Sequence, residues 1–78
     1  MTNTVYRVEM MMFEPDVTEY TSFDTMKEAV KWANEHISEY DAYDVYEIDV
    51  NTFEEEVVWS DKVASRVRRV IEGIRAGR

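Results

Sequence analysis

The chain has 78 residues, 45% of them hydrophobic, and carries 17 acidic against nine basic side chains, a net charge of −8. This size predicts a single domain spanning residues 1–78, and the aromatic and β-branched content argues against a disordered acidic tail. The chain contains no cysteine, which excludes disulfides, zinc–thiolate sites and thiol catalysis. No apolar run is long enough to cross a bilayer and no basic-flanked apolar leader is present, so we expect a cytoplasmic protein without a membrane partner.

The charge is divided unevenly along the chain. Residues 1–61 carry sixteen acidic and three basic side chains, whereas residues 62–78 carry six basic side chains and one acidic side chain. The two parts therefore have net charges of −13 and +5. Such a division describes the surfaces that a protein presents to its partners rather than its fold.

The first predicted element is a strand over residues 4–13, where β-branched, aromatic and methionine side chains are concentrated. Pro15 has no N–H to donate to a strand ladder, so we expect this strand to end there and residues 14–22 to form a polar connection. A helix is predicted over residues 25–40. Thr25 and Glu28 have the spacing of a capping box, and apolar residues follow at helical intervals.

Two further strands are predicted over residues 43–50 and 55–59, and the short connection between them predicts an antiparallel hairpin. Ser60 or Asp61 caps a last helix. Its apolar stripe consists of Val63, Val67, Val70, Ile71 and Ile74. The order β-α-β-β-α predicts an α+β domain with a three-stranded sheet and two helices packed on one face. The third strand lies either between the other two or at an edge.

With both helices on one side, the other face of the sheet stays open. We place on it a largely apolar set of side chains: Val5, Met11, Phe13, Tyr43 and Val45, with Trp59 or Val57. A small monomer rarely exposes so much apolar area, so we predict a homodimer through this face or through an edge strand. The alternative is that the last helix wraps round and covers the same face.

The sequence offers little for catalysis or metal binding. His36 is the only histidine, and Glu35 and Glu39 beside it lack the further ligands and the second shell that a metal requires. The serines lie in no nucleophile elbow, and no glycine-rich phosphate loop is present. Carboxylates are abundant, but acid–base catalysis by a pair of them needs a deep pocket that a domain of this size rarely forms. We therefore expect no enzyme activity, no cofactor and no metal.

The acidic side chains suggest a binding surface instead. Their spacings on helix and strand place neighbouring carboxylates about 6–7 Å apart, which is comparable to successive phosphates along a nucleic-acid strand. A rigid array of this kind can occupy a Lys/Arg-lined groove built for nucleic acid, so we expect a basic protein surface as partner. The predicted face consists of Glu35, Glu39, Asp44, Glu47, Asp49, Glu54, Glu55 and Glu56. The alternative is a solvated acidic surface that confers only solubility.

Basic residues near the C-terminus form a second candidate surface. It consists of Lys62, Arg66, Arg69 and Arg75. Basic residues on one helix can follow a phosphate backbone. The acidic body would repel nucleic acid, however, so we expect these side chains to pair with acidic residues of the same chain or of a second subunit.

A short, acidic, cysteine-free chain with this pattern resembles the small inhibitors that phages encode against host defence, anti-CRISPR proteins in particular. The likeness is carried by the strand sequence VYRVE at residues 5–9, the helix entry FDTMKEA at residues 23–29 and the acidic strand YEIDV at residues 46–50. The resemblance implies a stoichiometric, non-enzymatic inhibitor in the host cytoplasm that blocks a nucleic-acid-binding surface on a Cas effector complex. The alternatives are a small dimeric structural or regulatory module that uses an apolar sheet face, and a nucleic-acid-binding regulator that uses the basic last helix.

Overall fold

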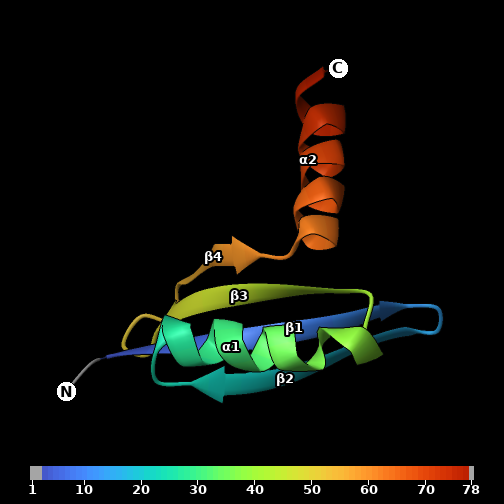
Figure 1. The fold of residues 1–78 in the computed structure, drawn as a ribbon. Coiled ribbons are helices and arrows are strands. Elements are labelled where there is room, and N and C mark those ends of the chain that lie inside the picture. Colours follow the sequence, from blue (N-terminus) through green and yellow to red (C-terminus); the bar gives the residue numbers. More distant parts are fainter. Residues whose placement is uncertain (1–2, 78) are drawn as a thin grey trace.

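A computed structural model describes residues 3–77 of the protein, with side chains for residues 3–73. The elements in chain order are β1 (Thr4–Phe13), β2 (Asp16–Phe23), α1 (Met26–His36), the 3-10 turn η1 (Ile37–Glu39), β3 (Ala42–Asp49), β4 (Glu55–Ser60) and α2 (Lys62–Gly77). The four strands form one antiparallel sheet in the order β2-β1-β3-β4, and α1 lies along one face of it (Figure 1). The chain is a single small α+β domain. Neither helix is long and apolar enough to span a membrane, as far as the described residues extend.

The strand β2 corrects two predictions, the polar connection over residues 14–22 and the sheet of only three strands. Glu14 and Pro15 form a tight turn, after which β2 returns along β1 with Phe13 opposite Asp16. The Val, Thr, Tyr and Phe residues of β2 are favoured in strands. Most of its side chains are exposed because β2 is an edge strand with β1 as its one neighbour. Because many of its side chains are polar and exposed, the amino-acid sequence of such an edge strand resembles that of a loop.

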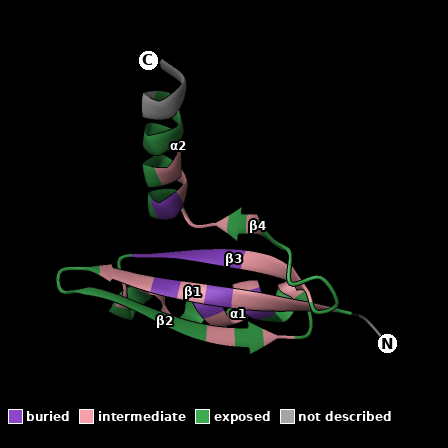
Figure 2. Ribbon diagram, turned by 180° about the vertical axis from the view of Figure 1, so that it is seen from behind, coloured by how far each residue is buried: buried purple, intermediate pink, exposed green. Residues whose placement is uncertain are grey.

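The hydrophobic core lies between α1 and the sheet (Figure 2). Its buried side chains are Val8, Met10, Ala29, Ala33, Tyr43 and Val45. The register places Val8 opposite Val45 and Met10 opposite Tyr43, so these four side chains form two adjacent cross-strand pairs on one face. The two alanines are fully buried on the inner side of α1. Their small side chains let the helix backbone approach the sheet closely.

Side chains fix where both helices begin. Thr25 caps α1, since its Oγ1 accepts a hydrogen bond from the N–H of Glu28 at 3.2 Å and its hydroxyl donates to the Glu28 carboxylate at 2.9 Å. The predicted cap at Thr25 is thus confirmed, with the Glu28 carboxylate bound to the Thr25 hydroxyl rather than to a backbone N–H as in a full capping box. Asp61 caps α2: its Oδ1 accepts from the N–H of Ala64 at 2.9 Å and also from the N–H of Tyr43 at 3.3 Å. One carboxylate therefore both starts the last helix and ties it to β3.

Helix α2 does not share the face that α1 covers, which corrects the predicted placement of both helices on one face. Successive residues of a strand point to opposite sides, so Val45 lies under α1 while Asp44 points away from it and binds Arg68 of α2. Beyond its first turns α2 projects from the sheet (Figure 1). The radius of gyration is accordingly 13.4 Å, compared with about 11.5 Å for a compact domain of this length.

The two faces of β1 yield a stability prediction from one matched pair of substitutions. Met10 is 1% exposed beneath α1, whereas its neighbour Met11 points to the other face and is partly exposed. We expect Met10→Ala to reduce the free energy of unfolding by about 2–5 kcal/mol because it leaves a cavity. Met11→Ala should cost less than half as much. Urea unfolding followed by circular dichroism measures both values, and equal losses would contradict the assignment of faces.

Candidate functional site

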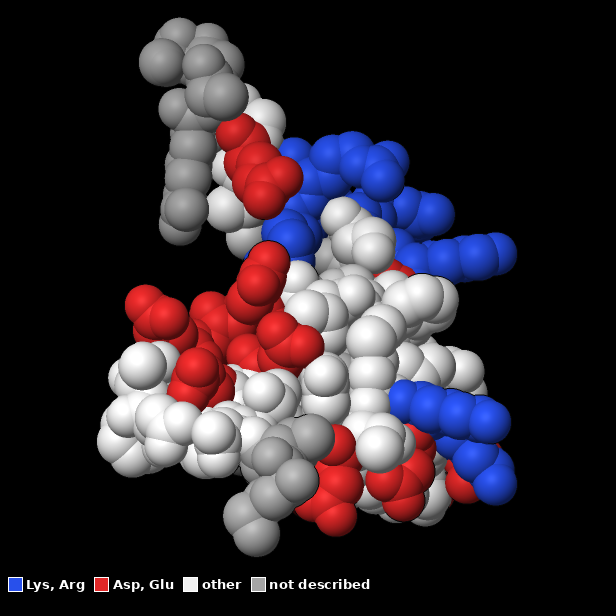
Figure 3. Space-filling model, turned by 90° about the vertical axis from the view of Figure 1, so that its left-hand side faces the viewer, with Lys and Arg blue, Asp and Glu red and all other residues white. Residues whose placement is uncertain are grey.

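Acidic residues converge where β3 turns into β4. They line an open hollow of about 560 Å³, here called the acidic hollow, formed by Thr4, Glu47, Asp49, Glu54, Glu55 and Glu56. Figure 3 shows acidic side chains gathered at this end of the sheet, below α2. Five of the eight residues predicted to form an acidic face therefore lie together.

The β3–β4 turn holds part of this hollow in a fixed shape. The Asp49 carboxylate accepts hydrogen bonds from the backbone N–H groups of Asn51 at 2.8 Å and Thr52 at 3.3 Å. The Asp49 carbonyl accepts another from the N–H of Phe53 at 2.7 Å. Phe53 adopts a left-handed backbone conformation, with φ of 62°, and its side chain is 77% exposed. Asp49 is thus engaged in the turn itself, whereas Glu54 on the other side of the turn has an exposed side chain.

Glu47 and Glu56 stand directly opposite each other across β3 and β4. Like charges at such positions repel, so the fold holds these carboxylates together at some cost in stability. Glu47 also accepts a hydrogen bond from the hydroxyl of Tyr6 at 3.0 Å. This hydrogen bond is the main cause that raises the pKa of Tyr6, with smaller contributions from burial and from the charge of Glu47. Glu47 therefore has a partner in β1, while Glu56 is exposed.

The other three predicted acidic residues lie elsewhere, so the prediction of one face containing all eight is wrong. Glu35 in the last turn of α1 and Glu39 in η1 are exposed at the end of the sheet opposite the β3–β4 turn (Figure 1). The direction of α1 carries them away from the acidic hollow. Asp44 is only 5% exposed, because its position in β3 points it at α2.

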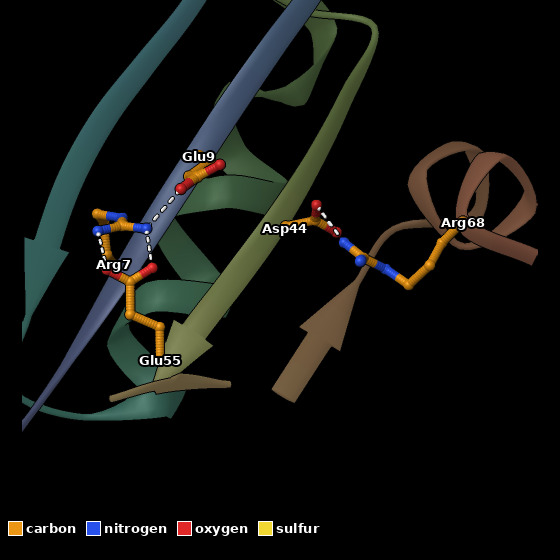
Figure 4. Close-up of polar contacts among 5 residues, drawn as sticks. All are labelled: Arg7, Glu9, Asp44, Glu55 and Arg68. Atoms are coloured by element: carbon orange, nitrogen blue, oxygen red, sulfur yellow. Dashed lines mark hydrogen bonds and ion pairs between the residues drawn. The ribbon is translucent and has the colours of Figure 1, made fainter. Parts of the chain in front are cut away.

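Asp44 and Arg68 form the ion pair that joins β3 to α2. Arg68 Nη2 lies 2.7 Å from Asp44 Oδ2 (Figure 4). The hydroxyl of Ser60 donates to the other carboxylate oxygen of Asp44. Partial burial disfavours the charged guanidinium, but the hydrogen bond and the charge of Asp44 outweigh burial and raise the pKa of Arg68. Sequence reasoning missed Arg68, although it lies four residues after the buried Ala64 and therefore on the same side of the helix.

A charged network occupies the middle of the sheet face that points away from α1. The guanidinium of Arg7 lies 5.5 Å from the ring centroid of Tyr20 and 5.0 Å from that of Tyr46. It binds Glu9 at 2.6 Å and Glu55 at 2.8 Å (Figure 4). The hydrogen bond that Arg7 donates to Glu55 is the largest cause that raises the pKa of Arg7; burial opposes this rise, and Glu9 adds to it. This face is therefore not the continuous apolar surface that the sequence predicts.

The predicted dimer face is also divided between the two sides of the sheet. Tyr43 and Val45 are buried under α1, because odd-numbered residues of β3 stand beside even-numbered residues of β1 on the same face. Trp59 stands next to Val45 and its indole N–H donates to the Tyr43 hydroxyl at 3.1 Å. The members that lie on the face away from α1 are Val5, Met11, Phe13 and Val57. Of these, Met11 and Phe13 adjoin α2.

Basic residues gather on one side of α2 (Figure 3). Lys62, Arg66 and Arg69 line a shallow hollow of about 280 Å³ together with Ser60 and Ser65. None of the three forms an ion pair with any residue whose side chain the structure describes, so the predicted internal pairing does not occur there. The side chain of Arg75, the fourth predicted member, lies outside the described residues.

The ring of His36 makes its contacts within α1. Its ring stacks on Trp32 with a centroid distance of 4.2 Å, and its Nδ1 lies 2.8 Å from the Trp32 carbonyl oxygen. Within the part of the chain that is described, no three His, Asp or Glu residues are grouped to hold a metal ion.

The Asp44–Arg68 pair gives a testable prediction about what holds α2. We expect Arg68→Met to reduce the free energy of unfolding by about 2 kcal/mol, because it leaves a buried carboxylate without its cation. The matched control is Arg66→Met on the exposed side of the same helix, which should change the value by less than about 0.5 kcal/mol. Urea unfolding measures both. Equal effects of the two substitutions would show that the pair does not anchor the helix.

The Tyr6–Glu47 hydrogen bond predicts an effect at alkaline pH. The pKa of Tyr6 lies above its ordinary value of 10.0 in the folded protein, so the stability that this bond contributes is present below pH 10 and lost as pH rises through the folded pKa. We expect Glu47→Gln to lower the pKa of Tyr6, measured by NMR titration of its ring resonances. Glu56→Gln serves as the control and should leave it nearly unchanged. An unaltered Tyr6 titration in the Glu47 variant would rule out the bond.

The molecule thus presents an acidic hollow at one end of the sheet and a basic side on a projecting helix. No protein-family model, curated protein or solved structure matches the chain.

Proposed function

We propose that this protein is a non-enzymatic inhibitor that places the acidic hollow against a Lys/Arg-lined, nucleic-acid-binding surface of another protein. The observation that carries the proposal is the convergence of five acidic residues on one open hollow that no described basic residue lines. The resemblance in size and charge to anti-CRISPR proteins supports a Cas effector complex in the host cytoplasm as the partner. The inhibitor would act by occupying the nucleic-acid site.

The arrangement of the hollow suits this role because its charges are held by strands and a bonded turn rather than by a mobile loop. Asp49 is fixed by the turn and Glu47 by Tyr6, so little side-chain freedom is lost when a partner binds there. Glu54 and Glu56 are exposed and make no ion pair with a described residue. A basic partner would neutralise them and release bound counterions, which predicts binding that weakens steeply with salt.

The basic side of α2 favours a second candidate, a regulator that binds nucleic acid directly. Lys62, Arg66 and Arg69 are exposed, lie on one side of the helix and have no acidic partner among the described residues. Such a surface can contact phosphates. The two candidates differ in the sign of the partner's charge, so an experiment that identifies the bound molecule as protein or nucleic acid separates them.

A competition experiment tests the inhibitor. Purified Cas effector complexes are mixed with fluorescently labelled duplex DNA, and the protein is titrated while DNA binding is followed by fluorescence anisotropy. We expect the wild-type protein to displace DNA and the variant Glu54→Lys/Glu56→Lys to compete at least about tenfold more weakly. These two positions are preferred to Asp49, whose replacement would break the turn, and to Glu47, which binds Tyr6.

The matched control carries the same change in net charge at the other end of the sheet. Glu35→Lys/Glu39→Lys also converts two exposed glutamates into lysines, yet it should compete as the wild type does. Equal losses from the two double variants would mean that net charge alone matters. Failure of the wild type to displace DNA would reject this partner. Retention of the labelled DNA by the protein itself would favour the nucleic-acid-binding alternative.

A further inference from the structure

Helix α2 exposes a stripe of large apolar side chains. The stripe consists of Val63, Val67, Val70 and Ile71, which are between 38% and 57% exposed. Their spacings of three and four residues place them along one side of the helix, as in helices that pack against another helix. Ala64 and Arg68, through which α2 contacts the sheet, adjoin Val67 and Ile71 on the helix surface, and the stripe itself stays largely exposed.

The stripe continues into an apolar groove between α2 and the sheet. Val67 and Ile71 form one wall and Met11 and Phe13 of β1 form the other, around a volume of about 320 Å³. Ala64, Glu72 and the Asp44–Arg68 pair complete the lining. Phe13 is 51% exposed although it is one of the largest apolar side chains in the chain. Stripe and groove therefore make one contiguous apolar surface, a feature that marks association sites on soluble proteins.

The solvent-accessible surface of the chain is larger than that of a compact monomer, by about the area that a dimer interface buries. It exposes 5744 Å², whereas a compact monomer of 9.3 kDa exposes about 5,000 Å². The excess of about 700 Å² is close to the area of about 800 Å² that each partner buries in a stable protein interface. The projection of α2 from the sheet adds to this surface and to the radius of gyration.

Charge favours a second copy of the same chain as the occupant. The body over residues 1–61 has a net charge of −13, and the segment that follows has +5. Among the described basic side chains of α2, only Arg68 reaches an acidic residue of its own body. Lys62, Arg66 and Arg69 form no ion pair with a residue whose side chain the structure describes, and the acidic body of a second copy can supply their partners.

We infer that the protein is a two-fold homodimer in which the α2 stripe of each copy lies in the α2–β1 groove of the other. A two-fold axis brings the same surface of both subunits together. The stripe of each copy then fills the groove of the other, and neither groove is left empty. The stripe side chains that make the contact are apolar, and the dimer is therefore expected to persist at salt concentrations that weaken contacts made by the acidic hollow. This dimer does not depend on the proposed inhibitor function.

Light scattering coupled to size-exclusion chromatography tests the inference on the full chain. At concentrations from about 10 to about 100 µM the wild type should have twice the monomer mass of 9.3 kDa. Val70→Asp, at the most exposed position of the stripe, should give the monomer mass because it places a charge in the apolar contact. Ile71→Asp is a second variant with the same expectation, and circular dichroism confirms that each remains folded.

Val50→Asp is the matched control, since Val50 is 41% exposed at the β3–β4 turn and lies outside the stripe and groove. It should remain dimeric. The variant Glu54→Lys/Glu56→Lys should also remain dimeric, and this result would show that the acidic hollow is not part of the dimer interface. A wild-type monomer at about 100 µM would overturn the inference, including the case in which the groove serves a different protein. A dimer that both stripe variants leave intact would overturn it too.

Discussion

The buried carboxylate of Asp44 is the constraint on which the shape of this molecule depends. A charge with 5% exposure requires a partner, and the only cation that reaches it within the described chain is Arg68, with the Ser60 hydroxyl on its other oxygen. Together with the Asp61 cap, this pair attaches α2 to β3 through polar contacts near its first turns. The apolar stripe of the helix begins beside the buried Ala64 and is 38–57% exposed, because α2 projects from the sheet beyond its first turns.

Alternation along the central strands explains why the two faces of the sheet differ so strongly. Positions of β1 and β3 that point to α1 hold the apolar core, and the intervening positions hold Arg7, Glu9, Tyr46 and Asp44. Arg7 crosses β3 to reach Glu55, so one guanidinium links β1 to β4 and partly neutralises an acidic residue at the edge of the hollow. Asp44 on this same face forms the ion pair that attaches α2.

Local patterns in the sequence predicted most of the elements but not how they face one another. β1, the α1 cap and the β3–β4 hairpin follow from β-branched content, the Thr25–Glu28 spacing and a short connection, and the structure has all three. β2 was missed because an edge strand exposes polar residues on both sides. The prediction placed Tyr43 and Val45 on the wrong face of the sheet, because the relative register of two strands cannot be read from the sequence of either strand alone. Arg7 was overlooked as a site residue, although it is the only basic residue before Lys27 in an acidic segment.

The position of the two proposed surfaces lets one molecule use both. The groove beside α2 is formed by the last residues of β1, whereas the acidic hollow lies at the β3–β4 turn, at the opposite end of the sheet. A dimer built through α2 would therefore leave two acidic hollows exposed, one on each subunit. Two linked sites bind a partner that carries two basic surfaces, or two neighbouring partners, more tightly than either site alone, because the second contact becomes intramolecular. Dimerisation would in that case strengthen binding to a basic partner, which is weak for a single acidic hollow in the presence of salt.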